Sequence, residues 1–284
     1  MADLVLPAFT DSHVHLGLID GEALAAGGIG RVLDLGWDPQ IAVDWRGPTV
    51  DIAGPLLAAP GGYPLASGWA PDAATREIAD AVAASSAIDD LVRWGARVAK
   101  ITLNSGAGPV WDDTLLAAVV TIAHNHGLPV VAHAQGSGQA ERALLSGVDC
   151  LAHTPWTETL SDELIGRMAT AMSWISTLDI HGCGTYGADF ARAIGNLERF
   201  AAADGVVHYG TDLGNGPLPV GLNRRELEAL AGAGLGIPSI VASLHGLLPD
   251  LTGATRTVIS GAESVDDLHA IDDVMRAEVV RSPA

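Results

Sequence analysis

The sequence predicts an α/β protein: a (β/α)8 TIM barrel followed by a short C-terminal extension. The chain has 284 residues, the length of one large barrel domain. Eight short apolar runs alternate with eight helix-like stretches, and this alternation favours a parallel sheet with right-handed crossovers that closes into a barrel. An open doubly wound sheet is the alternative, but no Gly-x-Gly-x-x-Gly motif follows the first strand.

The predicted strands are runs rich in Val, Ile, Leu and Ala, at residues 4–14, 31–36, 50–58, 98–103, 128–134, 149–154, 173–178 and 206–211. The predicted helices lie between or after them, at 20–27, 38–46, 71–94, 112–126, 138–146, 161–171, 188–203 and 223–234. Acidic residues in first turns, such as Asp72 and Asp112, and glycines after helix ends, such as Gly127, mark several of these helices. We expect the barrel to span 1–253 and the extension 254–284.

Composition narrows the class of function. The formal net charge of −19 argues against binding to nucleic acid or to an anionic membrane surface. No run of about 18 apolar residues is present, and the first residues lack the basic segment of a signal peptide. The two cysteines, Cys150 and Cys183, are too few for a disulfide framework. We therefore expect a cytoplasmic protein that acts on a small molecule.

Polar residues gather where the predicted strands end, which is where barrel proteins carry their chemistry. His13 and His15 alternate along the first strand, so both imidazoles point to the same side. A His-x-His pair alone is a weak signal, because it occurs by chance in many chains. Here the fifth, sixth and eighth strands also end in polar residues, namely His133, His153 and Asp212. Together these side chains indicate a metal site at one end of the barrel.

Lys100 is the single lysine among 15 basic residues, and it lies inside an apolar strand. A buried ammonium costs several kcal/mol unless it is paired. In a structural role, the side chain would extend out of the barrel end or pair with Asp212. In a functional role, burial lowers the pKa of the amine, which can then add carbon dioxide. The resulting carbamate is an anion with two oxygens, suited to bridging two metal ions.

These residues resemble the amidohydrolase superfamily, specifically its members with two metals and a carboxylated lysine, and most closely the imidazolonepropionase and prolidase-like branch. The matching motifs occur in family order, one per predicted strand: 7–15 (PAFTDSHVH), 98–101 (VAKI), 131–134 (VAHA), 151–154 (LAHT) and 209–212 (YGTD). The resemblance implies that His13, His15 and Asp212 hold one metal, that His133 and His153 hold the other, and that carboxylated Lys100 bridges them. Two divalent ions are expected, zinc first, with manganese, iron or cobalt as alternatives.

The chain departs from the family in one respect. Relatives carry a small β-sandwich formed before and after the barrel, whereas only residues 1–6 precede the first motif here. The stretch 265–280 is similar to the last strand of that sandwich, and we expect it to pair with residues 4–6 or to cover the bottom of the barrel. The β-sandwich is thus predicted to be absent or vestigial. The shortened chain and its apolar tail favour a homo-oligomer.

The resemblance implies hydrolysis by a metal-bridging hydroxide, with Asp212 as general base and then general acid. Lys100 and His181 complete the predicted catalytic set, the first as carbamate and the second as a group that orients the substrate. The strand-to-helix loops supply predicted substrate-binding residues: Trp37, Tyr63, Asn104, Gln135, Trp156, His181 and Tyr186. Because these loops are rich in aromatic rings and nearly free of arginine, we expect a neutral aromatic or cyclic amide, lactam or cyclic ureide.

Other interpretations of the same residues remain open. The metal site could serve an ester or lactone hydrolase, or a lyase such as a decarboxylase. A barrel could also hold metal for structure alone, since a fold does not fix a function. A mononuclear site of the deaminase type is disfavoured by Lys100, because such relatives do not use a lysine on the fourth strand. A catalytic site would keep an open coordination position, and a structural site would be closed.

Overall fold

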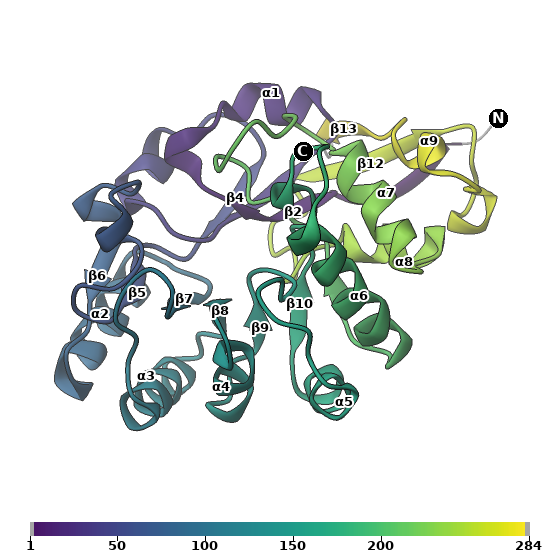
Figure 1. Ribbon diagram of the computed structural model, residues 1–284. Helices are drawn as coiled ribbons and strands as arrows, with labels where there is room; N and C mark the ends of the chain where they lie inside the picture. Colours follow the sequence, from purple (N-terminus) through teal and green to yellow (C-terminus); the bar gives the residue numbers. More distant parts are fainter. Residues whose placement is uncertain (1–2, 282–284) are drawn as a thin grey trace.

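The computed structural model describes residues 3–281. Parallel strands form its inner layer, and helices lie around their outside (Figure 1). Two parallel sheets make up this layer. The first has the order β2-β3-β4, formed by β2 (Thr10–Val14), β3 (Arg31–Asp34) and β4 (Thr49–Ile52). The second has the order β11-β10-β9-β8-β7-β5-β6, formed by β5 (Leu56–Ala58), β6 (Thr75–Glu77), β7 (Ala99–Asn104), β8 (Val130–Gln135), β9 (Cys150–Leu151), β10 (Ser173–Ile175) and β11 (Val207–His208).

Backbone contacts join the two parallel sheets at both ends. On one side the amide of Ser12 donates to the carbonyl oxygen of Tyr209 at 3.0 Å, and Val14 forms a parallel bridge with Leu213. On the other side the amide of Arg97 donates to the carbonyl oxygen of Ile52 at 2.9 Å. Within residues 3–281 the ladders remain separate sheets rather than one continuous eight-stranded ring. The predicted α/β class is confirmed as a TIM-barrel-like fold.

The outer layer contains α1 (Gly21–Ala26), α2 (Ala81–Arg93), α3 (Asp113–Asn125), α4 (Gln139–Leu145), α5 (Asp162–Ala171), α6 (Ala188–Ala202), α7 (Arg224–Gly232) and α8 (Ile237–Ser243). Side chains cap several N-termini as expected for such residues: Asp80 accepts from the amide of Ala83, and Asp112 from that of Leu115. In Figure 1, α2 to α6 follow one another around the outside of strands β5 to β10. This arrangement leaves the strand ends free to carry the site.

Several predicted elements are divided or replaced. The predicted strand 4–14 is two strands that join different sheets, and the strand 50–58 is interrupted where Gly54 adopts a positive φ of 72° before Pro55. The predicted helix 38–46 is a 3-10 helix, η2 (Pro39–Asp44). The predicted helix 71–94 begins only at Ala81, because a short 3-10 turn, η4 (Asp72–Ala74), and β6 come first. Each error falls where glycine, proline or a short edge strand interrupts a longer pattern.

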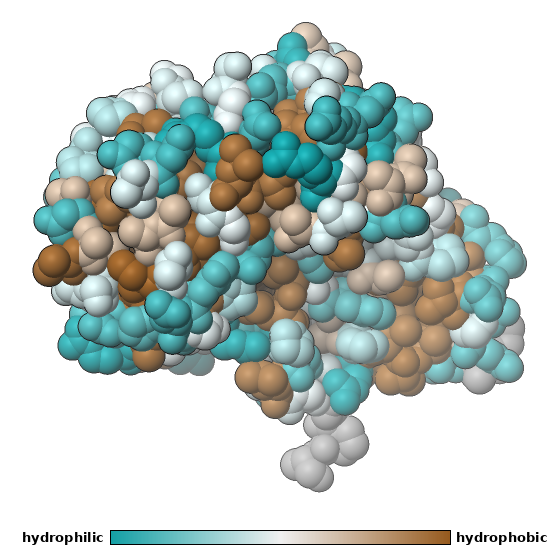
Figure 2. Space-filling view, turned by 90° about the horizontal axis from the view of Figure 1, so that it is seen from below, coloured by the Kyte–Doolittle hydropathy of each residue, from teal (hydrophilic) through white to brown (hydrophobic). Residues whose placement is uncertain are grey.

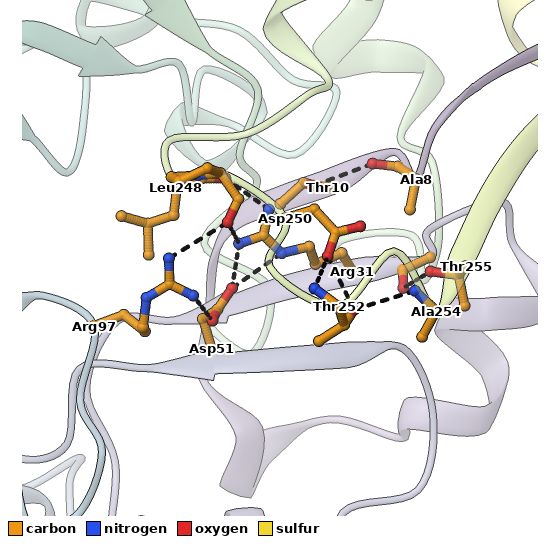
Figure 3. Close-up of polar contacts among 12 residues, drawn as sticks. Ala8, Thr10, Arg31, Asp51, Arg97, Leu248, Asp250, Thr252, Ala254 and Thr255 are labelled. Carbon is orange, nitrogen blue, oxygen red and sulfur yellow. Dashed lines mark hydrogen bonds and ion pairs between the residues drawn. The ribbon is translucent and has the colours of Figure 1, made fainter. Parts of the chain in front are cut away.

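The bottom of the barrel is closed by the segment after α8. Leu247 and Leu248 pack against the interior cluster of the barrel, which includes Leu33, Val98 and Ile175. Two arginines fix this segment, as Figure 3 shows for Leu248. Arg31 donates to the carbonyl oxygen of Leu248 at 2.6 Å, and both Arg31 and Arg97 pair with Asp51.

A small antiparallel sheet of order β1-β12-β13 lies beside the barrel, formed by β1 (Asp3–Pro7), β12 (Thr255–Ser260) and β13 (Glu278–Arg281). Leu4 and Leu6 are buried on one face of β1 while Val5 is exposed. The partners of residues 4–6 are residues 257–259 of β12. The predicted pairing with 265–280 is therefore wrong, because that stretch forms η6 (Val265–Asp267), α9 (Ile271–Val274) and the start of β13, which pairs with β12 instead. The division at residue 253 stays a prediction.

The surface mixes hydrophilic and hydrophobic side chains, as Figure 2 shows for the face seen from below. Single large apolar side chains such as Val82 and Leu145 are exposed, which is normal for a folded domain. Among the described helices, none combines the length and the apolar character that a membrane crossing requires.

Candidate metal centre

The six side chains predicted as metal ligands line one small cavity at the end of the inner strands. The cavity is bordered by His13, His15, Leu56, Tyr63, Trp69, Lys100, His133, His153, Asp212 and Asn215. The predicted ligands come from β2, β7 and β8 and from the segments directly after β2, β9 and β11, so the strand ends bring together residues that lie up to about two hundred positions apart. Their contact with metal stays a prediction.

His13, His15 and Asp212 form the most compact part of this cavity. The Nε2 atoms of His13 and His15 lie 3.3 and 3.1 Å from Oδ1 of Asp212, and the three ligand atoms fall within 4.8 Å of one another. Each Nδ1 lies 2.9 Å from a backbone carbonyl oxygen, that of Ala152 for His13 and that of Gly36 for His15. Since a carbonyl only accepts, Nδ1 of each ring carries the proton and Nε2 offers its lone pair to the cavity.

Asp212 is held in place by its own neighbours. Its backbone, at a positive φ of 60°, donates to the carbonyl oxygen of His13 at 2.8 Å, and the side-chain amide of Asn215 donates to Oδ1 at 2.9 Å. Burial alone would raise the pKa of Asp212, but the neighbouring side chains of His13 and His15 hold it well below its usual range. The carboxylate is therefore ionised and available to a cation.

Lys100 is 1% exposed and does not extend out of the barrel end. Burial lowers its pKa to about 7, against the opposing attraction of Asp212. Among residues 3–281 its Nζ atom has no hydrogen bond or ion pair, so the expected pairing with Asp212 is not formed. A buried amine that is half neutral near pH 7 has the reactivity needed for addition to carbon dioxide.

His133 and His153 lie next to each other, with ring centroids 4.9 Å apart, and the His153 ring is 4.7 Å from that of His13. Burial lowers the pKa of His133 to about 4 and that of His153 well below its ordinary value, so both are neutral at pH 7. Nδ1 of His153 lies 2.9 Å from the hydroxyl of Thr177. Neutral imidazoles are the form that binds metal.

Asn104 and Gln135 support His133, and their predicted contact with substrate stays a prediction. The side-chain amide of Asn104 donates to Oε1 of Gln135 at 2.7 Å, and Nε2 of His133 lies 3.0 Å from the same oxygen. Because this oxygen accepts from both, Nε2 of His133 carries the proton in this arrangement. The two amides thus fix the His133 ring.

Aromatic rings surround the histidines. Tyr63 stacks on His133 at 4.8 Å, and Trp69 meets His15 at 5.2 Å. The Trp156 ring lies 5.3 Å from that of His153. The Trp37 ring lies 6.2 Å from that of His15 and 6.0 Å from that of Trp69. These rings limit the access of water to the cavity and offer flat apolar surfaces to a ligand.

His181 and Tyr186 lie outside the residues that line the cavity. His181 packs against Trp156 at 4.8 Å, and its buried Nε2 has no hydrogen-bond partner among the described residues. Tyr186 is 44% exposed, stacks on Phe190, and its hydroxyl lies 3.2 Å from Asp179. Tyr186 thus packs against the start of α6, outside the lining of the cavity, and its contact with substrate stays a prediction.

Two buried carboxylates were not predicted as site residues. Asp11 accepts from the amide of His13 at 3.1 Å and from the amide and hydroxyl of Thr211 at 3.0 and 2.6 Å. It therefore ties the strand that carries both N-terminal histidines to the residue before Asp212. Asp34 accepts from the amide of Leu16 at 3.1 Å, just after His15. An acidic residue inside an apolar run was the available signal for Asp34.

Fold and cavity together define a TIM-barrel-like protein with histidines, a carboxylate and a lysine at one mouth. No protein-family profile and no curated protein matches the sequence. Solved structures do match: an Xaa-Pro dipeptidase with bound methionine (TM-score 0.74, 19% identity, 98% of this chain and 84% of that chain) and an amidohydrolase (TM-score 0.68, 21% identity, 92% and 81%). Ochratoxinase of A. niger also matches (TM-score 0.68, 18% identity, 84% and 70%). The chain has the amidohydrolase fold, and the resemblance predicted from the motifs is confirmed at the level of the fold.

Proposed function

We propose that this protein is an amidohydrolase that uses metal ions to cleave a C–N bond of a neutral aromatic or cyclic small molecule, in an amide, a lactam or a cyclic ureide. One observation carries the proposal: four histidines, an ionised aspartate and a buried lysine line the same cavity. Structural neighbours described as an amidohydrolase and an Xaa-Pro dipeptidase support hydrolysis of a C–N bond.

The donor set fits two divalent cations. His13, His15 and Asp212 offer two imidazole nitrogens and a carboxylate, the ligand types that zinc prefers, and their orientation is already fixed through Nδ1. His133 and His153 provide only neutral donors, so a second cation there needs a further anion. Lys100 supplies it if its neutral amine forms an N–C bond with carbon dioxide and releases one proton. Zinc is the metal we propose, with manganese, iron and cobalt as alternatives.

Bound metal ions would polarise the substrate carbonyl and lower the pKa of a water molecule. The protein's own part is proton transfer, orientation and shielding. Asp212 faces the cavity and is placed to take a proton from the attacking water and return it to the leaving nitrogen. Burial raises the pKa of Tyr63 above its ordinary value, so its hydroxyl stays protonated and can donate to an oxygen of the substrate. Trp69 and Trp156 restrict water.

Charge around the mouth supports a neutral substrate. None of the cavity residues is an arginine, and Lys100 is the only cationic side chain among them. Two arginines that contact the mouth loops from helices are engaged: Arg225 of α7 pairs with Asp179, and Arg192 of α6 donates to the carbonyl oxygen of Trp156. Neither of these two guanidinium groups is free to bind a dianionic substrate.

Metal analysis and product analysis test the proposal. We expect about two divalent ions per chain after purification without chelators, and release of an amine from neutral aromatic amides or lactams. Release of an alcohol would instead indicate an ester or lactone hydrolase, and release of carbon dioxide a lyase. Metal binding without turnover of any of these compounds would indicate a structural site. Strong selectivity for dicarboxylates would contradict the proposed substrate class.

We further propose that the protein works in the cytoplasm as a homo-oligomer. The small sheet beside the barrel exposes apolar side chains, Val5 at 59% on β1 and Val280 at 39% on β13, together with Leu251 at 73% nearby in sequence. Light scattering coupled to size-exclusion chromatography would measure the mass of the assembly. A monomer at micromolar concentration would overturn this part of the proposal.

A further inference from the structure

Glu226 is a buried carboxylate that the proposed reaction does not use. It lies on α7, is 0% exposed, and faces the turn that follows β10. Its two oxygens accept from the amide of Leu178 at 2.9 and 2.8 Å, and one also accepts from the amide of Asp179 at 2.7 Å. Among the described residues no arginine or lysine pairs with it. A buried carboxylate without a cationic partner costs folding free energy, so we ask what its contacts with these two amides achieve.

The turn that Glu226 holds is strained at Thr177. This residue has a positive φ of 41°, which a β-branched side chain rarely adopts and which costs about 1–3 kcal/mol. The backbone amide of Thr177 donates to the carbonyl oxygen of Gly210 at 3.0 Å, close to Asp212. The next two amides both donate to Glu226. The carboxylate therefore stabilises a turn that would otherwise relax.

The strained turn places the Thr177 hydroxyl on His153. His13 and His15 are oriented by backbone carbonyls, which lie in regular strands or next to them. His153 is different, because its Nδ1 lies 2.9 Å from a hydroxyl, Oγ1 of Thr177. A hydroxyl on a relaxed turn could rotate or withdraw, and the His153 ring would then lose its fixed direction toward the cavity. Partners of this kind tune ligand histidines by about 10–100-fold in metal affinity.

We propose that Glu226 is a positioning residue for His153: it locks the turn at 177–179 so that the Thr177 hydroxyl directs the imidazole into the cavity. A second set of contacts supports the same turn, since Asn223 and Arg225 of the same helix end hold the side chain of Asp179. The expected effect of Glu226 on metal affinity rests on the proposed function. Its expected effect on the orientation of the His153 ring does not depend on that function.

Four variants separate the positioning role from a general structural role. Glu226→Gln keeps the size of the side chain but replaces one accepting oxygen by a donor, and Thr177→Val removes only the hydroxyl. Thr177→Ser keeps the hydroxyl and should therefore keep the His153 ring oriented as in the wild type. Glu228→Gln is the matched control, because Glu228 lies on the exposed side of the same helix and pairs only with Arg224. Circular dichroism melting would verify that each variant folds.

The first measurement is the imidazole NMR spectrum of the metal-free protein. In the wild type, in T177S and in E228Q, we expect a slowly exchanging Nδ1–H signal from His153. In T177V and E226Q this signal should shift and exchange at least tenfold faster. Unchanged His153 signals in folded T177V and E226Q would overturn the proposal, whatever the protein binds.

The second measurement is cobalt titration of the same variants. The wild type should bind two ions, and T177V and E226Q should weaken one of them at least tenfold while the other keeps its affinity. Two unchanged affinities in both variants would refute the effect on the metal site while leaving the proposed function intact. A wild type that binds no metal would refute the proposed function, and the NMR result would still decide the role of Glu226.

Discussion

Replacing Glu226 by Gln should make the protein more stable near neutral pH, although it weakens the support of His153. Burial raises the pKa of Glu226 from 4.5 to about 7, against the hydrogen bonds from Leu178 and Ser176, and the negative charge of Asp179 adds to the rise. At about 1.36 kcal/mol per unit of pKa, the difference between the unfolded and folded values corresponds to about 3 kcal/mol. The charged form of this side chain therefore costs the fold that amount.

The sign follows from where the proton is bound. Between pH 4.5 and about 7 the folded state holds a proton on Glu226 that the unfolded state has lost. The stability contribution of this group is therefore complete below pH 4.5 and is lost as the pH rises through about 7. E226Q carries a neutral side chain at every pH. We expect equal free energies of unfolding at low pH, and an excess of up to about 3 kcal/mol for the variant above neutrality.

Urea denaturation at a series of pH values from about 4.5 to 8, with both proteins at the same metal content, measures this difference. Other buried carboxyls with raised pKa, such as Asp11 and Asp34, are present in both proteins and cancel. E228Q should follow the wild type at every pH, because its side chain is exposed. A difference between E226Q and wild type that does not change with pH would refute the reasoning, as would a loss of stability confined to high pH.

The remaining predictions concern the cavity, its mouth and the barrel bottom. Lys100→Met should abolish hydrolysis and reduce the metal bound per chain from two ions to one, as measured by mass spectrometry of the metal; full metal content would contradict the bridging role. Trp156→Ala should raise KM at least tenfold, whereas Tyr186→Phe should change kcat and KM less than twofold in steady-state assays; equal effects would show that the mouth is misassigned. Asp51→Asn should lower the free energy of unfolding by about 3 kcal/mol, because it removes the partner of buried Arg31; a loss below about 1 kcal/mol in urea titrations would contradict this.

Six of the cavity residues were predictable because they stand out against their own strands, and the family resemblance then implied their roles; Leu56, Trp69 and Asn215 were not predicted. Lys100 is a lone lysine in an apolar run, and His13 and His15 keep the period of two that puts both on one face. The rule that barrel sites lie at carboxyl strand ends then brought together residues far apart in sequence. The alternation of side chains along a strand and the position of strand ends were thus sufficient to place these residues at one site.

The surrounding contacts were not predictable in the same way. Glu226 reaches the turn after β10 from a different helix, and nothing in the residues next to either partner signals the contact. The direction of Tyr186 was not predictable because a loop side chain has no periodicity to fix it, and here it stacks on Phe190. The pairing of β1 with β12 depends on the path of the chain around the whole barrel. Contacts that depend on tertiary packing between distant segments produce no recognisable pattern in the sequence around either residue.

The pKa values around the cavity show that the charged groups placed there lower the stability of the metal-free fold. Burial raises the pKa of Asp11 to about 7 and that of Asp34 to about 6, and it lowers that of Lys100 to about 7. Each shift favours the neutral form, so each charged form is held against its own solvation. A cation bound beside these groups would stabilise the carboxylates, and ligands that bind only the folded state raise its stability. Metal should therefore raise the melting temperature most at neutral pH and above, where Asp11 and Asp34 lose their protons, and neutral replacements of these two carboxyls should gain stability only in the metal-free protein.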